Sequence, residues 1–211
     1  MNFNDQLSRT ELRELIPQPT GLVLDKELDV LDKHCQSLIA RSPFLLVATS
    51  SQDGRCDVSP RGDAPGFVQI LDQKRLAIPD RPGNRRLDTI ENILDNPQIG
   101  LLFVIPGMRE TLRVNGKACI TRDSKILDKG TVDGKRPMLA IGVEVEEAFI
   151  HCAKAFIRSN LWKAETWPDM RDLPSIAQML IDHANYKKVT TNQSERDLDD
   201  ELEHDYKTEL Y

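Results

Sequence analysis

The sequence predicts a mainly β protein with added helices (α+β), arranged as an antiparallel barrel with peripheral helices. Short runs of β-branched and apolar residues follow one another closely between residues 44 and 150. Few helical patterns between these runs are long enough to connect the parallel strands of a doubly wound sheet. With 211 residues the chain is long enough for one well-buried domain, whereas two domains would be cramped.

The expected strands are bounded by turn residues and by changes of hydrophobic period. Asp53-Gly54 between the first two runs indicates a hairpin, and Pro60 marks a strand end or an edge strand because proline cannot donate to a sheet. We expect strands at Phe44–Ser50, Arg55–Ser59, Phe67–Leu71, Arg75–Pro79, Gly100–Ile105, Glu110–Ile120 and Met138–Ile150.

Apolar residues at helical spacing predict the helices. The first such stripe follows Asp25, which is a plausible helix cap. We expect helices at Asp25–Arg41, Arg85–Leu94, Ser124–Lys129, His151–Arg158 and Pro174–His183. Residues 1–24 are interrupted by Pro17 and Pro19 and are expected to form a loosely packed arm, while residues 25–186 form the main domain.

Residues 187–211 form an acidic tail. From Glu195 onward there are eight acidic and two basic residues, a balance of −6 that equals the net charge of the whole chain. An apolar residue recurs every fourth position, at Leu198, Leu202, Tyr206 and Leu210. This spacing indicates an amphipathic helix if the tail docks and a solvated tail if it does not.

Composition excludes several classes of function. The remainder of the chain has no net charge, so no basic surface for nucleic acid is expected. Neither a membrane span nor a signal peptide is recognisable, and four scattered cysteines suggest reduced thiols, so we expect a cytoplasmic protein. Walker, GxGxxG, HExxH and GxSxG motifs are missing, and no zinc-ligand spacing is found. The sequence therefore assigns no metal site and no catalytic residue.

The turn Asp80–Leu87 is the strongest candidate for ligand binding. It packs Arg81, Asn84, Arg85 and Arg86 between an apolar strand and an expected helix. Free N–H groups at a helix start, the helix dipole and planar guanidinium donors suit a phosphate. The alternative is a basic loop that forms ion pairs with the neighbouring acidic residues.

Three further segments combine polar residues with strand ends. Val58-Ser59-Pro60-Arg61 ends a strand and is either a solvated turn or a backbone contact for a flat ligand. Arg113 lies on the polar face of its strand and is as compatible with a structural role as with a functional one. The segment His151–Trp162 groups charged and flat side chains suited to shaping a pocket, namely His151, Cys152, Lys154, Arg158 and Trp162.

In this order the segments resemble the pyridoxamine 5′-phosphate oxidase-like family of FMN-binding proteins, over roughly residues 25–170. The matching motifs are Asp57–Asp63, Leu76–Asp88, Leu112–Ala118 and His151–Ala155 with Arg158, Leu161 and Trp162. The resemblance implies a split β-barrel of the FMN-binding type that forms a homodimer with FMN at the interface.

The resemblance also implies roles for individual residues. Strands matching Val58–Arg61 and Ala77-Ile78-Pro79 would line the flavin, and the turn matching Arg81–Arg86 would hold its phosphate. The segment matching His151–Trp162 would approach the flavin ring from the partner subunit. The Arg-x-His element of the vitamin B6 oxidases near the C-terminus is missing here, so we do not expect pyridoxamine phosphate as the substrate.

Two kinds of function remain open. The first is an FMN-dependent oxidoreductase that passes electrons from a reduced nicotinamide or flavin donor to a small organic acceptor. The second is a non-catalytic module that binds FMN, haem or another planar ligand, with His151 as an axial ligand in the haem variant. The substrate and the electron donor cannot be read from the sequence.

Overall fold

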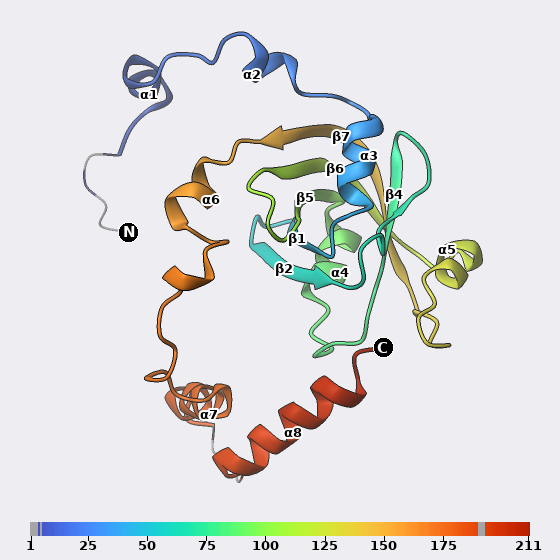
Figure 1. Cartoon of the computed structure of the whole chain (residues 1–211), viewed down its shortest axis with the longest axis vertical. Helices are drawn as coiled ribbons and strands as arrows, with labels where there is room; N and C mark the ends of the chain where they lie inside the picture. The colour runs from blue at the N-terminus through green and yellow to red at the C-terminus, as the bar shows by residue number, and fades with distance from the viewer. Residues whose placement is uncertain (1–3, 5, 190–192) are drawn as a thin grey trace.

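One antiparallel sheet forms the centre of the computed structural model, which describes residues 4, 6–189 and 193–211 (Figure 1). The seven strands follow the spatial order β2-β1-β5-β6-β7-β4-β3. Their bounds are β1 Phe44–Ser50, β2 Cys56–Gly62, β3 Gln69–Ile70, β4 Arg75–Pro79, β5 Gln98–Val104, β6 Thr111–Thr121 and β7 Ala140–His151.

The predicted α+β fold with an antiparallel sheet is confirmed. The sheet is not closed in the described structure, since the outermost strands β2 and β3 do not pair with each other. The predicted hairpin joins β1 to β2, with Gly54 at a positive φ of 83°. β2 continues past Pro60 to Gly62 instead of ending at Ser59. It can do so because it is an edge strand, where a missing N–H is tolerated.

Alternation along the central strands builds the core. Leu45 and Val47 of β1, Leu101 and Phe103 of β5, and Val114 of β6 are all buried. Since successive side chains of a strand point to opposite faces, this pattern directs one face of the sheet inward. The inward face packs with helices α3 (Lys33–Ile39) and α4 (Asp88–Asp95) in one hydrophobic cluster.

The two longest strands, β6 and β7, carry a register shift between Asn115 and Gly116. A Cβ added at Gly116 would lie 2.0 Å from the carbonyl oxygen of Glu144 on β7. Only glycine therefore allows the two backbones to approach this closely. The shift lets both strands bend and extend from the core to the cavities described below.

Several helices begin later than the sequence predicts. The helix expected at 25–41 is replaced by α2 (Leu22–Asp25), an isolated bridge from Leu28 to Ala148, and α3, whose N-cap is Asp32 instead of Asp25. The Asp32 carboxylate accepts backbone hydrogen bonds from His34 and Cys35, which fixes this start.

The remaining helices differ mainly at their ends. α4 starts at Asp88, three residues after the predicted start at Arg85. α6 (Lys154–Ser159) starts three residues after the predicted start at His151, which is instead the last residue of β7. α5 (Ser124–Lys129) has the predicted bounds, and α7 (Ile176–Tyr186) is shifted by two to three residues. Within the described residues, no helix has the length and apolar character needed to cross a membrane.

The terminal segments lie outside the sheet. In the expected arm 1–24, α1 (Arg9–Leu15) has no buried residue and stops before Pro17, so the proline ends a helix rather than preventing one. The tail forms α8 (Glu195–Thr208). This helix lies apart from the sheet, and the chain after it ends near the loop between β4 and α4 (Figure 1). Residues 1–3, 5 and 190–192 of these two segments lie outside the described residues.

Candidate functional site

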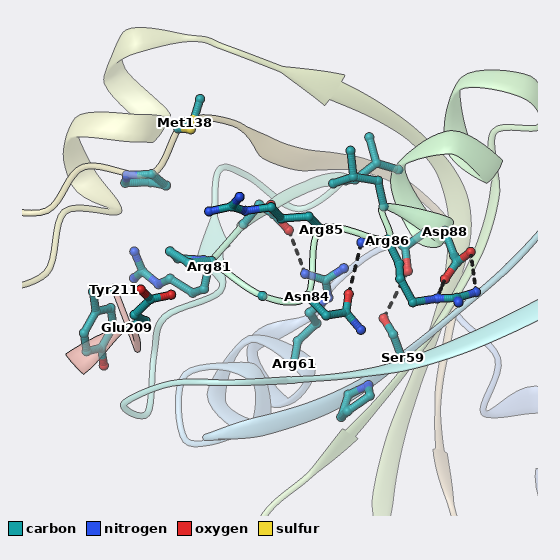
Figure 2. A pocket seen from close by; sticks show the side chains of 18 of the residues that line it. Ser59, Arg61, Arg81, Asn84, Arg85, Arg86, Asp88, Met138, Glu209 and Tyr211 are labelled. Carbon is teal, nitrogen blue, oxygen red and sulfur yellow. Dashed lines mark hydrogen bonds and ion pairs between the residues drawn. The ribbon is translucent and has the colours of Figure 1, made fainter. Parts of the chain in front are cut away.

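A cavity of about 610 Å³ lies where the edge strand β2 meets the loop between β4 and α4 (Figure 2). The segment before β7 and the end of the tail complete its wall. We call it the arginine cavity, and its lining is Asp57, Val58, Ser59, Pro60, Arg61, Asp80, Arg81, Pro82, Gly83, Asn84, Arg85, Arg86, Leu87, Asp88, Thr89, Ile90, Lys135, Arg136, Pro137, Met138, Glu209 and Tyr211.

The loop between β4 and α4 has an unusual backbone. Arg85 and Leu87 both have positive φ angles, 59° and 60°, which non-glycine residues adopt only when their surroundings enforce them. Leu87 is also the N-cap of α4, and its side chain offers no hydrogen bond to the first turn. The N-terminus of α4 therefore meets the cavity at Asp88, Thr89 and Ile90 without a side-chain cap.

Most arginines around the cavity form ion pairs within the chain. The guanidinium of Arg61 lies 2.6 Å from the Asp80 carboxylate, and Arg86 lies 2.7 Å from Asp88. The backbone N–H of Arg86 also donates to the side-chain oxygen of Asn84. The alternative of a salt-bridged loop, left open by the sequence, therefore accounts for part of this cluster.

Arg85 behaves differently. No hydrogen bond or ion pair of its guanidinium is found among the described residues. Its side chain extends into the space between Arg81 and Met138 (Figure 2). A charged group aimed into a cavity without a protein partner is a suitable contact for an anionic ligand.

Arg81 is held by the protein itself. Its guanidinium lies 2.7 Å from the carboxylate of Asp63, which is only 2% exposed, and it donates to the carbonyl oxygen of Gly130. The hydroxyl of Tyr211 donates to the same carboxylate at 2.9 Å, and its ring lies 5.1 Å from the Arg81 guanidinium carbon. The Asp63 carboxylate therefore holds both Arg81 of the loop and Tyr211 of the tail.

The electrostatics of this anchor follow from its contacts. Burial alone would raise the pKa of Asp63, but hydrogen bonds from the Ala64 N–H, Tyr211 and Arg81 outweigh it and lower that pKa. The hydrogen bond to Asp63 raises the pKa of the Tyr211 phenol. At neutral pH the carboxylate is therefore ionised and the phenol keeps its proton.

A second cavity of about 340 Å³ opens on the outer face of the sheet and has an almost entirely apolar surface. We call it the apolar cavity. It shares Val58 with the arginine cavity, so the two lie next to each other along β2. Its lining is Leu46, Ala48, Val58, Gly100, Leu101, Leu102, Arg113, Asn115 and His151.

Two polar residues of the apolar cavity, Arg113 and His151, are affected by neighbouring charges. Arg113 pairs with Glu147 at 2.7 Å and lies over the ring of Phe149, 4.1 Å from its centroid. Burial, together with the positive charges of Arg113 and Lys26, lowers the pKa of His151 below 6.5. The imidazole is therefore neutral at pH 7.

Two buried nitrogen atoms beside the cavities have no partner in the described structure. They are the Nε atoms of Arg61, at the arginine cavity, and of Arg113, at the apolar cavity. Such atoms are costly to leave without a hydrogen bond. Both arginines line a cavity with other parts of their side chains.

Other residues proposed from the sequence do not line either cavity. Ala77, Ile78 and Pro79 are buried and line neither cavity, so their place beside a flavin stays a prediction. Cys152, Lys154 and Arg158 are exposed. Trp162 donates its Nε1–H to the carbonyl oxygen of Met108 and packs near Phe156, a structural arrangement within the chain.

Sequence reasoning missed several lining residues. Lys135, Arg136 and Met138 come from the loop before β7, which carries no recognisable motif. Glu209 and Tyr211 belong to the tail, whose amphipathic spacing points to Leu210 rather than to them. No group of His, Cys, Asp or Glu side chains in the described part of the chain is arranged to hold a metal ion.

Solved structures of low sequence identity resemble this chain. HupZ of Group A Streptococcus is 20% identical with a TM-score of 0.47, and 56% of this chain matches 92% of that one. A general stress protein 26-related protein of the pyridoxinephosphate oxidase family from Clostridium acetobutylicum is 17% identical, with a TM-score of 0.41 and coverages of 56% and 85%. The heme storage protein HutZ of Vibrio cholerae is 15% identical, with a TM-score of 0.39 and coverages of 57% and 94%.

Comparison with protein families identifies the chain. No curated protein sequence matches it. The family model described as "Pyridoxamine 5′-phosphate oxidase" matches residues 31–152, which include β1 to β7 and the loop between β4 and α4. The chain therefore belongs to the pyridoxamine 5′-phosphate oxidase family.

Proposed function

We propose that this protein is a homodimeric FMN-dependent oxidoreductase that passes electrons from a reduced nicotinamide or flavin donor to a small organic acceptor. The observation that carries the proposal is the partnerless Arg85 guanidinium in a cavity that also meets the uncapped start of α4. Both features suit the phosphate of a mononucleotide. Residues 25–186 would form the FMN-binding domain, in the cytoplasm, where the four free thiols fit a reducing environment.

The linings of the two cavities suit the two ends of FMN. A phosphate held by Arg85 leaves the apolar cavity beyond Val58 for a flat ring. When bound, the flavin ring supplies the electron transfer, while these residues hold and orient it.

The homodimer is supported by the outer face of the sheet. Val58 is 60% exposed, and around it Leu46, Ala48 and Leu102 form an apolar surface that faces solvent in a single chain. A second subunit on this face would bury the apolar cavity and exclude water from the ring. The segment from His151 to Trp162 is proposed to approach the ring from the partner subunit.

A spectrum of the purified protein tests the proposal directly. With FMN bound, we expect flavin absorption bands that bleach rapidly when NADH or NADPH is added without oxygen. An acceptor or oxygen should restore them. A colourless protein that does not bind added FMN would contradict the proposal.

The phosphate assignment is tested by a double variant, Arg85→Ala with Arg86→Ala. Each charge-assisted hydrogen bond contributes about 1.5–3 kcal/mol, so FMN affinity should fall by at least about tenfold. The matched control is Arg75→Ala with Arg171→Ala, which removes two exposed arginines outside the cavity. Equal FMN affinity of the two double variants, measured by titration of flavin fluorescence, would refute the assignment.

A non-catalytic module for a planar ligand such as haem is the second candidate. It is favoured by the neutral imidazole of His151 in the wall of the apolar cavity. A neutral imidazole nitrogen can ligate haem iron, whereas FMN needs no such ligand. A haem absorption band that appears on adding haem and disappears in His151→Ala would favour this candidate over the flavin.

A further inference from the structure

We propose that the tail residues Glu209–Tyr211 close one end of the arginine cavity and make the site selective for a mononucleotide over a dinucleotide. The inference rests on the proposed binding of FMN and deepens it by assigning a specificity-determining role to a segment outside the family match at residues 31–152.

Tyr211 is fixed to the wall of the cavity from two sides. Its hydroxyl donates to the Asp63 carboxylate at 2.9 Å, and its ring lies 5.1 Å from the Arg81 guanidinium carbon. Asp63 and Arg81 are themselves nearly buried, with side chains 2% and 15% exposed. The ring is therefore anchored to a rigid part of the domain.

The tail forms a wall of the cavity and does not fill it. A volume of about 610 Å³ remains with Glu209 and Tyr211 in place, and Arg85 still extends into it. A segment that competed with the ligand would instead occupy the space around Arg85. The arrangement is that of an end wall.

This wall stands opposite the part of the cavity that leads to the flat ring. Ser59 and Asp88 lie at one end, and Glu209 and Tyr211 lie at the other, with Arg85 between them (Figure 2). The apolar cavity adjoins the Ser59 end through Val58. If the flavin ring lies at that end and the phosphate at Arg85, a group attached beyond the phosphate would lie toward Tyr211.

Both tail residues oppose such an extension. The ring of Tyr211 takes up space that an attached nucleotide needs. The carboxylate of Glu209 lines the same end and would repel a second phosphate. FMN ends at its single phosphate, whereas FAD continues with a second phosphate and an adenosine, so the wall admits the first and disfavours the second.

The test compares FMN and FAD binding in the full-length chain. Wild-type protein is expected to bind FMN more tightly than FAD. In Tyr211→Ala this preference should shrink about tenfold, mainly because FAD binds more tightly once the ring is gone. Glu209→Gln should shift the preference in the same direction while leaving Tyr211 anchored. Both affinities are measured by flavin fluorescence titration.

Tyr206→Ala is the matched control, because this tyrosine lies on α8, is 58% exposed and does not line the cavity. It should keep the wild-type preference. The inference is overturned if Tyr211→Ala and Glu209→Gln keep the wild-type ratio, or if both ligands weaken equally. If wild-type protein and the variants all fail to bind FMN, the proposed function falls and the inference falls with it.

Discussion

Arg81 and Arg85 stand four positions apart in one loop, yet the structure gives them opposite roles. Arg81 is enclosed by Asp63, Tyr211 and the carbonyl oxygen of Gly130, so its charge is already used by the protein. Arg85 has a left-handed backbone and a guanidinium with no partner in the described structure. The loop thus separates a charge that maintains the fold from a charge that is available to a ligand.

This division predicts a loss of stability in Arg81→Met. The variant leaves the Asp63 carboxylate buried without its cation, which should lower the free energy of unfolding by about 3 kcal/mol. Urea denaturation at pH 7 measures it. The exposed pair of Arg75 and Asp72 provides the control, since Arg75→Met should change stability by less than about 1 kcal/mol. Equal effects of the two substitutions would show that the buried pair is not stabilising.

The same pair has a characteristic pH dependence. The folded state lowers the pKa of Asp63, so the wild-type stabilisation is present above the carboxyl pKa of the unfolded chain and is lost as pH falls through the folded value. Arg81→Met removes much of that stabilisation. The gap in stability between wild type and variant should therefore narrow as the pH is lowered from about 7 toward about 3.

Individual site residues could be predicted from the sequence where they are close together in it. The cluster Arg81–Arg86 and the strand end Val58–Arg61 do line one cavity. Tyr211 could not be found in this way, because its contact with Asp63 spans 148 positions. Ala77 and Ile78 were assigned to the site only through the family resemblance, and their burial gives them a role in the core.

At the scale of elements, β6 and β7 set the geometry around the sites. The register shift at Gly116 bends the pair, and beyond it Arg113 and His151 reach the apolar cavity. Because the backbone of β7 passes so close to Gly116, the bend depends on the absence of a side chain.

Gly116→Ala should therefore destabilise the protein. The added Cβ would sit 2.0 Å from the Glu144 carbonyl oxygen, a backbone atom that can move only with its strand. We expect a loss of about 2–3 kcal/mol in the free energy of unfolding, measured by urea denaturation. Gly83→Ala is the control, since its Cβ meets no atom within 4 Å. A Gly116→Ala protein as stable as the control would mean that the two strands separate without cost.

Strands were predicted more accurately than helix starts for a physical reason. Continuous runs of apolar residues mark β1 and β4, and both strands have the predicted bounds. A helix start depends on one cap and on the backbone before it. Asp32 replaced Asp25 as a cap, and the left-handed Leu87 delayed α4 to Asp88. Neither the cap at Asp32 nor the backbone of Leu87 produces a periodic pattern in the sequence.

At the scale of the whole molecule, the outer face of the sheet is the surface on which the proposed homodimer depends. Leu46 and Leu102 are only partly covered in the single chain and border the apolar cavity. In the proposed homodimer this surface is buried, so assembly and ligand binding are linked.

Leu102→Glu tests this link. A charge buried between two subunits is unfavourable, so the variant should sediment as a monomer where the wild type sediments as a dimer. Its FMN affinity should fall at the same time. Leu94→Glu, on a leucine that is 70% exposed at the end of α4, should change neither property. A dimeric Leu102→Glu protein with normal FMN affinity would contradict the proposed interface.

Pro60 has a further consequence for the molecule in concentrated solution. It lies within β2, the edge of the sheet that is long enough to recruit another chain, whereas β3 at the opposite edge has only two residues. Without an N–H at Pro60, β2 lacks one rung of the ladder that a foreign strand would need. The fold thereby disfavours the growth of continuous intermolecular sheets along this edge.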